Sequence, residues 1–81
     1  MTRDEIKSVF LKELCRVAPD IEPDDVSEDD HLLDDLDLDS MDVLNLVTAL
    51  QSRFGVSVPE IDYPRLETIK KAVDYLGAKL A

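Results

Sequence analysis

The sequence predicts an all-α fold, a four-helix bundle of three long antiparallel helices and one short helix. Apolar residues recur at helical spacing in three segments, and each segment carries residues that typically begin or end a helix. The chain has 81 residues, enough for one thin core, so we expect a single domain over residues 1–81.

The first helix is predicted from Arg3 to Ala18. Thr2 and Glu5 match a capping box, in which each side chain accepts a hydrogen bond from the other residue's backbone N–H, and Pro19 ends the helix. The apolar residues expected to face the core are Ile6, Val9, Phe10, Leu14 and Val17.

A long acidic connection follows over residues 19–39. Such a connection is unusual in a compact domain unless it has a function or is held to the core. We expect apolar side chains to hold it, and a short helical turn near residues 26–29. The expected anchors are Ile21, Val26, Leu32, Leu33 and Leu36.

The second long helix is predicted over Ser40–Phe54, with Asp39 as its N-cap and Gly55 as its C-terminal stop. A short third helix is predicted over Asp62–Leu66, where a proline near the start is tolerated. The last long helix is predicted to follow Thr68, which is a typical cap residue.

Charge is distributed unevenly along the chain. There are 19 acidic and 9 basic residues, giving a formal net charge of −10. Twelve of the acidic residues lie between Asp20 and Asp42, and no Lys or Arg occurs between Arg16 and Arg53. Because a phosphate backbone requires a Lys/Arg surface, this composition argues against nucleic acid and favours protein partners with basic surfaces.

The residue composition also argues against several other classes of protein. One cysteine, Cys15, excludes an internal disulfide, and with one histidine, His31, a zinc site is not expected. The polar N-terminus predicts no signal peptide, and the absence of a long apolar run predicts no membrane span. We therefore expect a cytoplasmic monomer.

A calcium site is a competing interpretation of the acidic run. Asp35, Asp37 and Asp39 have the spacing of the first three ligands of an EF-hand loop. The match fails later, because Ser40 stands where the loop needs Gly and Leu46 where it needs a bidentate Glu. We expect no metal site.

Ser40 is the most informative residue of the chain. Its hydroxyl is predicted at the start of a helix, among carboxylates. A catalytic serine needs a base within hydrogen-bond reach and a group that orients the base. His31 is the sole histidine, and no residue obviously supplies an oxyanion hole. We therefore expect a serine that another enzyme modifies, in a protein that is not itself an enzyme.

The residues around Ser40 resemble the prosthetic-group site of acyl carrier proteins. The run is Asp35-Leu36-Asp37-Leu38-Asp39-Ser40-Met41, and the family pattern is Asp-Leu-Gly-x-Asp-Ser-Leu followed by an apolar-periodic helix. Further matches in register are Phe54, Val58-Pro59, Thr68-Ile69 and the run from Ala72 to Leu76. The likeness covers nearly the whole chain and is strongest from Leu32 to Leu76.

This resemblance implies that Ser40 carries 4′-phosphopantetheine, transferred from coenzyme A by a phosphopantetheinyl transferase. The thiol of that arm would hold acyl groups as thioesters for enzymes of fatty-acid, polyketide or related acyl metabolism. Those enzymes would dock through basic patches and bind quickly but weakly. The residues expected to contact them are Asp35, Asp37, Asp39, Met41, Asp42, Leu44 and Asn45.

The sequence departs from the family pattern at three positions. Asp37 replaces the usual Gly, Asn45 replaces an acidic partner-contact residue, and Tyr63 stands where the residue is often small. We therefore hypothesise a specialised, freestanding carrier. Family members enclose acyl chains within the core, and a ring at position 63 would narrow that space, which predicts short or polar cargo. The core residues concerned are Leu32, Val47, Leu50, Val58, Leu66, Ala72 and Leu76.

Three alternatives stay open at this stage. The first is a carrier of aminoacyl or other specialised groups for a dedicated ligase. The second is an unmodified acidic helical adaptor that docks on basic proteins. The third is a calcium-responsive module, which would require saturable calcium binding.

Overall fold

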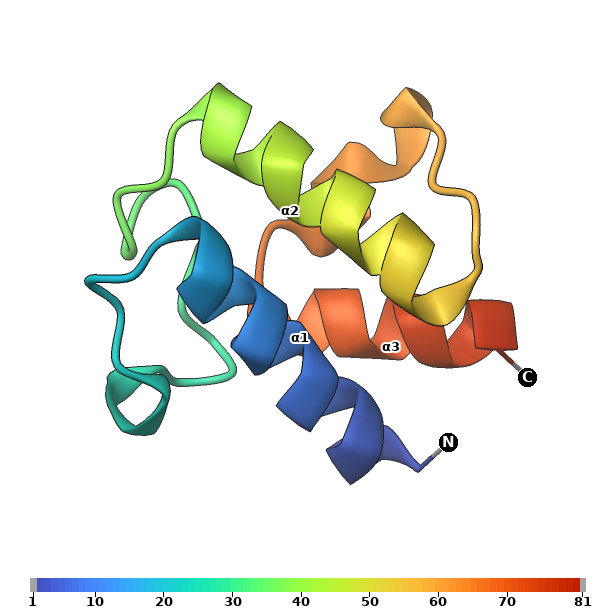
Figure 1. The fold of residues 1–81 in the computed structure, drawn as a ribbon, viewed down its shortest axis with the longest axis horizontal. Helices are drawn as coiled ribbons and strands as arrows, with labels where there is room; N and C mark the ends of the chain where they lie inside the picture. Colours follow the sequence, from blue (N-terminus) through green and yellow to red (C-terminus); the bar gives the residue numbers. More distant parts are fainter. Residues whose placement is uncertain (1, 81) are drawn as a thin grey trace.

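The computed structural model describes residues 2–80, which form three α-helices and two 3₁₀ helices. In chain order these are α1 (Arg3–Val17), η1 (Pro23–Asp25), α2 (Ser40–Phe54), η2 (Glu60–Leu66) and α3 (Ile69–Leu80). α1 packs against both α2 and α3 and runs opposite to them in Figure 1, and η2 packs on α3. The predicted all-α four-helix bundle is confirmed, with η2 as its short helix and η1 as an added turn. No helix within residues 2–80 has the length and apolar character needed to cross a membrane.

The predicted helix boundaries are close to the observed ones because the capping residues act as expected. Thr2 Oγ1 accepts from the Glu5 N–H at 3.2 Å, and Glu5 Oε1 accepts from the Thr2 N–H at 2.9 Å. Gly55 ends α2 with φ 66°, the left-handed conformation that glycine adopts most easily. At the start of α3, Thr68 Oγ1 accepts from the Lys71 N–H at 3.1 Å.

One hydrophobic core joins the three α-helices, the connection between α1 and α2, and η2. It includes most of the apolar faces predicted from helical spacing and all seven residues expected around an acyl chain. The buried apolar residues are Ile6, Phe10, Leu14, Leu32, Leu38, Leu46, Val47, Leu50, Val58, Leu66, Ile69, Ala72, Val73, Tyr75 and Leu76.

Tyr75 links η2 to α3. Its hydroxyl donates a hydrogen bond of 2.6 Å to Asp62 Oδ2, and its ring is largely buried. Burial, together with this hydrogen bond to a carboxylate, raises the pKa of Tyr75 to about 12. The contact fixes η2, which extends two residues further toward the N-terminus than the predicted Asp62–Leu66.

The connection between α1 and α2 is irregular and is held against the start of α3. In Figure 1 it lies, in blue-green and green, at the end of the bundle where α1 ends and α2 begins. The Leu32 N–H donates to the Glu67 carbonyl and the Lys70 N–H donates to the Glu28 carbonyl, each at 2.9 Å. Backbone hydrogen bonds therefore complement the apolar anchors that the sequence predicted.

Two expectations about this connection were wrong. The short helical turn lies at Pro23–Asp25 rather than at 26–29, because Pro23 presets the φ angle of its first residue and Val26 already has an extended backbone. Leu33 does not anchor the connection, since it is 46% exposed while Leu32 is 1% exposed. Leu32, whose N–H donates to the carbonyl of Glu67 between η2 and α3, is the buried one of the pair, and Leu38 is a buried anchor instead.

Candidate functional site

Ser40 is the first residue of α2, and its side chain is exposed. The capping role belongs to its neighbour: Asp39 Oδ1 accepts from the Asp42 N–H at 2.8 Å, and Asp42 Oδ2 accepts from the Asp39 N–H at 3.4 Å. Within residues 2–80, none of the side-chain hydrogen bonds uses Ser40 Oγ. The fold does not depend on this hydroxyl, so its oxygen is available to another molecule.

The turn that leads to Ser40 is fixed by leucines on both sides of Asp37. Leu36 is half-buried and Leu38 is 4% exposed, and the Leu38 N–H donates to the Leu32 carbonyl at 3.1 Å. Asp37 has φ 57°, the only left-handed non-glycine backbone within residues 2–80. Aspartate tolerates this conformation better than most residues, but glycine adopts it with less strain. The two leucines therefore impose a conformation that places Asp37 in solvent.

A mostly apolar groove of about 650 Å³ opens beside Ser40, between the connection, α2 and η2. We call it the apolar groove. Leu33, Met41 and Leu44 line it and are 46%, 61% and 43% exposed, so three of the largest exposed apolar side chains gather next to one hydroxyl. Tyr63 and Leu66 line the η2 side, so Tyr63 and Ser40 border the same groove.

His31 also lines the apolar groove, but its ring nitrogens face other groups. Nδ1 accepts from the Leu33 N–H at 3.3 Å and the Asp34 N–H at 3.4 Å, while Nε2 lies 3.5 Å from Glu67 Oε2. Glu67 also accepts a hydrogen bond from Lys71, which lowers the pKa of Glu67. These contacts give His31 a structural role, holding the turn of the connection near the entrance to α3.

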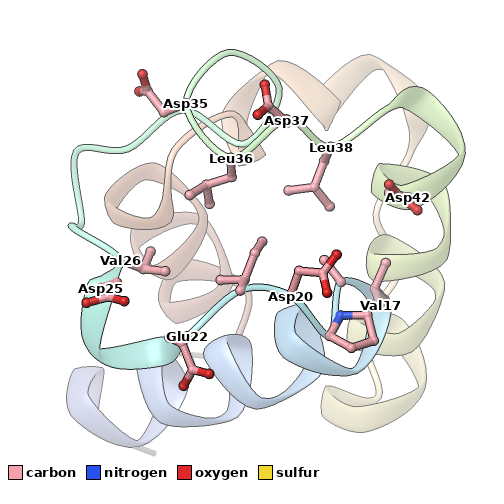
Figure 2. Close-up of a pocket in the computed structure, with 13 residues that line it drawn as sticks. Val17, Asp20, Glu22, Asp25, Val26, Asp35, Leu36, Asp37, Leu38 and Asp42 are labelled. Atoms are coloured by element: carbon pink, nitrogen blue, oxygen red, sulfur yellow. The ribbon is translucent and has the colours of Figure 1, made fainter.

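The residues predicted to contact partners fall into two groups around Ser40. Met41 and Leu44 line the apolar groove. Asp35, Asp37 and Asp42 line a second groove, on the side of α1, which Figure 2 shows. Asp39 and Asn45 are exposed and line neither groove.

Sequence reasoning missed Leu33 as part of this site. Two adjacent leucines in a turn rarely both face the core, so the Leu32-Leu33 pair is the signal that would have identified one exposed apolar residue. Glu60 and Glu67, which also line the apolar groove, were missed too, because their position depends on how η2 folds back toward α2.

The acidic side chains do not converge on a point. Within the described residues, no group of three or more His, Cys, Asp or Glu side chains lies close enough together to hold a metal ion. Asp35 Oδ2 accepts from the His31 N–H at 2.7 Å, and Asp39 is directed to the start of α2 by its capping bond. Asp35 and Asp39, two of the three carboxylates with EF-hand spacing, therefore each accept a different backbone N–H.

Comparisons with known proteins agree with this geometry. A family model described as "Phosphopantetheine attachment site" matches residues 8–76. An acyl carrier protein of Zymomonas mobilis is 37% identical over 75 residues, covering 93% of this chain and 90% of its own length. An acyl carrier protein of Petrotoga mobilis is 34% identical over 80 residues, covering 99% and 93% of the two chains.

A solved structure of an acyl carrier protein from Enterococcus faecalis has the same fold. It superimposes with a TM-score of 0.81 at 34% sequence identity, covering 98% of this chain and 99% of the other. The match extends over α1, α2, η2 and α3, so the agreement is not confined to the residues around Ser40. The chain belongs to the acyl carrier protein family, whose prosthetic group is a covalently attached phosphopantetheine.

Proposed function

We propose that Ser40 is the attachment point of the phosphopantetheine arm in this protein. The observation that carries the proposal is an exposed hydroxyl at the first residue of α2, which has no part in capping and opens onto an apolar groove. The residues fit the group: the oxygen is free to form the phosphodiester, and Leu33, Met41 and Leu44 offer apolar contacts to an arm lying along the surface.

In this function, the protein presents the Ser40 hydroxyl and positions the arm attached to it. The phosphopantetheine arm supplies a thiol that holds an acyl group as a thioester. The rigid start of α2 fixes where the arm begins, because Asp39 and Asp42 cap the helix directly around Ser40. The apolar groove shelters whatever is held near the serine, and the acidic residues beside it attract partners with basic surfaces.

The proposed partners are a phosphopantetheinyl transferase and enzymes that load, modify or accept the acyl group. We propose that the protein acts as a carrier without catalysing a reaction, and that it works in the cytoplasm. The contacts of His31 support the non-catalytic role, since both ring nitrogens face groups other than Ser40. Docking is expected to involve Asp35, Asp37, Asp42, Met41 and Leu44.

We further propose that the carrier is specialised and that Tyr63 restricts its cargo to short or polar acyl groups. Tyr63 is half-buried and forms part of the η2 wall of the apolar groove, opposite the exposed residues of α2. Leu32 and Leu66, which also line the groove, and Val47 in the core are closely covered: they are 1%, 2% and 1% exposed. A long saturated chain would have to displace the ring to reach them.

Intact-mass spectrometry tests the attachment site. The purified protein is incubated with coenzyme A and a promiscuous phosphopantetheinyl transferase, and the gain of one phosphopantetheinyl group is expected. Ser40→Ala should show no gain. Ser27, an exposed serine on the same acidic connection, provides the matched control. Ser27→Ala should gain the phosphopantetheinyl group to the same extent as the wild type. Modification of Ser40→Ala would contradict the proposal.

A second test addresses specialisation. Enzymes of general fatty-acid synthesis are offered this carrier and a housekeeping carrier, each loaded with the same acyl group. The proposal predicts slower use of this carrier, because Asn45 and Asp37 change the charges that such enzymes would meet. Equal rates with both carriers would contradict it.

A further inference from the structure

His31, the single histidine of the chain, lies in the connection and lines the apolar groove together with Ser40. Its Nδ1 atom accepts hydrogen bonds from the backbone N–H groups of Leu33 at 3.3 Å and Asp34 at 3.4 Å. These are the only hydrogen bonds of those two N–H groups within residues 2–80. One ring nitrogen therefore holds the backbone of the turn that carries Leu33 to the groove.

The backbone on either side of these two residues is fixed by other hydrogen bonds. Before them, the Leu32 N–H donates to the Glu67 carbonyl at 2.9 Å, and after them the Asp35 N–H donates to the His31 carbonyl at 2.8 Å. Neither bond uses the imidazole ring. Loss of Nδ1 as an acceptor would therefore act on residues 33 and 34 alone, where the Leu33 side chain is 46% exposed.

Protonation of the ring removes this acceptor. Because two N–H groups donate to Nδ1, that nitrogen is unprotonated, and the neutral ring carries its proton on Nε2, which lies 3.5 Å from Glu67 Oε2. Histidine is the side chain that ordinarily gains a proton between roughly pH 5 and 8. A protonated Nδ1 is a donor, and Asp34 Oδ2 lies 3.7 Å away to accept from it. The two protonation states therefore favour different arrangements of residues 33 and 34.

The charged groups that face the ring are mostly carboxylates. Asp34 and Asp35 belong to its own turn, and Asp35 accepts the backbone N–H of the histidine. Glu67, just before α3, accepts a hydrogen bond from Lys71, which lowers the pKa of Glu67 and keeps it ionised. Glu60 lines the same groove from η2, and α2 contributes no charged side chain to it. The carboxylates stabilise the charged ring and the two N–H groups stabilise the neutral ring, so the turn has two competing states.

We propose that His31 is a positioning residue for the carrier site, and that its protonation releases Leu33 from the wall of the apolar groove. Leu33, Met41 and Leu44 are the exposed apolar side chains that line the groove beside Ser40, so release of Leu33 opens one wall. With a neutral ring the wall is complete and covers an acyl group held there. With a charged ring it is open, and the thioester is easier for another molecule to reach. What occupies the groove rests on the proposed function, but the turn responds to pH with or without the arm.

Nuclear magnetic resonance titration of the unmodified protein tests the turn. The ¹⁵N-labelled protein is titrated from about pH 8 to about pH 5, and the amide signals of Leu33 and Asp34 should move with the midpoint of the His31 ring. Ring ¹⁵N shifts should show Nδ1 as the unprotonated nitrogen at high pH. His31→Asn is the matched control, since asparagine Oδ1 can accept the same N–H groups but does not titrate. Its Leu33 and Asp34 signals should stay in place through that midpoint.

Thioester cleavage tests the consequence for the carrier. Wild type and His31→Asn are loaded with the same butyryl group, and its release by hydroxylamine is followed by intact mass. Comparing the two proteins at one pH cancels the chemistry of the reagent. The two rates should be equal above the ring midpoint, and the wild type should be about threefold faster below it, as expected when a weak hydrogen bond is lost. His31→Ala, which lacks the acceptor at every pH, should show the faster release throughout.

Three results would overturn the proposal. Leu33 and Asp34 signals that move equally in His31→Asn would assign the change to the neighbouring carboxylates. A titrating ring without a response at Leu33 would mean that the turn does not depend on Nδ1. Relative release rates that do not change with pH would mean that the turn does not control access to the thioester. The titration needs no arm, so it stays valid if the mass test at Ser40 fails, and its own failure would leave the attachment site unaffected.

Discussion

At the scale of single residues, Asp39 and Ser40 have separate tasks although they are adjacent. Asp39 accepts the Asp42 N–H at 2.8 Å and begins α2, while the Ser40 hydroxyl is left without a structural bond. This division explains how a helix start can present a modifiable hydroxyl and stay intact. The Asp39-Ser40 pair therefore offers a cap and the proposed attachment point in consecutive positions.

Replacing Asp39 tests this division. Asp39→Ala should lower the free energy of unfolding by about 1 kcal/mol, because the Asp42 N–H loses its acceptor. Asp39→Ser keeps an oxygen at the cap and should retain most of that stability without the charge. Urea denaturation followed by circular dichroism measures both. If the serine variant were as unstable as the alanine variant, the carboxylate charge rather than the cap would be the stabilising feature.

Tyr63 is the residue at which the cargo proposal can be tested. Tyr63→Ala removes part of the η2 wall of the apolar groove, so the variant should accept a long saturated acyl chain more readily than the wild type. The readout is the rise in melting temperature when the arm carries a C16 acyl group instead of a C4 acyl group. The rise should be larger in Tyr63→Ala, and Tyr63→Phe should behave like the wild type. Large, core-wide chemical-shift changes in the C16-loaded wild type would contradict the narrowing.

At the scale of elements, η2 forms one wall of the apolar groove, and a polar contact joins it to α3 in addition to the packing of the buried Leu66. The Tyr75 hydroxyl donates to Asp62 at 2.6 Å in a largely buried setting. Arg65 and Lys79 lie over the ring of Tyr75, 6.0 Å and 5.5 Å from its centroid. The short helix is therefore fixed by its contacts with α3 more than by its own few hydrogen bonds.

Tyr75→Phe tests this attachment. It should lower the free energy of unfolding by about 1–2 kcal/mol near neutral pH, because the part-buried hydrogen bond to the Asp62 carboxylate is lost. The folded-state pKa of Tyr75 is about 12, above the ordinary value of 10, so this stability is present below pH 10 and is lost as the pH rises toward 12. The difference between wild type and variant should shrink over that window in urea titrations. If the difference in free energy of unfolding between wild type and Tyr75→Phe did not change with pH, the proposed role of the Tyr75 hydroxyl would be contradicted.

The elements were predictable to the extent that local rules decide them. Caps at Thr2, Asp39 and Gly55 fixed the helix boundaries within a residue or so, because each satisfies backbone groups that any helix leaves open. The connection was less predictable, since Leu32 and Leu33 have the same chemistry and the buried one is set by contacts with distant residues, such as the hydrogen bond of the Leu32 N–H to the Glu67 carbonyl.

Part of the site was predictable from local sequence, but its grooves were not. Ser40 and the acidic run could be recognised along the chain because they are contiguous. The two grooves could not, because each is formed by segments far apart in sequence, such as Leu33 with Tyr63 or Val17 with Leu36. Tyr75 is likewise buried where η2 packs on α3, an arrangement that involves two elements.

At the scale of the whole molecule, charge opposes the compact fold. The protein carries a net charge of −10 within dimensions of 30 × 25 × 19 Å. The Debye length is about 30 Å at 0.01 M salt, so at that ionic strength charges interact across the whole molecule. Repulsion among the carboxylates of the connection should therefore be a large part of what limits stability at low salt.

Salt should stabilise the protein. Raising sodium chloride from 0.01 M to 0.1 M shortens the Debye length to about 10 Å, and the melting temperature should rise by several degrees. The variant with Asp20→Asn, Glu22→Gln and Asp25→Asn should melt higher at low salt and gain less from added salt. Differential scanning calorimetry measures both. A melting temperature that falls with salt would mean that ion pairs such as those of Arg3 outweigh the repulsion.

The central claim is that the exposed hydroxyl of Ser40 carries the arm. The most direct measurement is the intact mass of wild type and Ser40→Ala after incubation with coenzyme A and a phosphopantetheinyl transferase. The wild type should gain one phosphopantetheinyl group and the variant none. A wild-type protein that stays unmodified, or a Ser40→Ala protein that gains the same mass, would contradict the account.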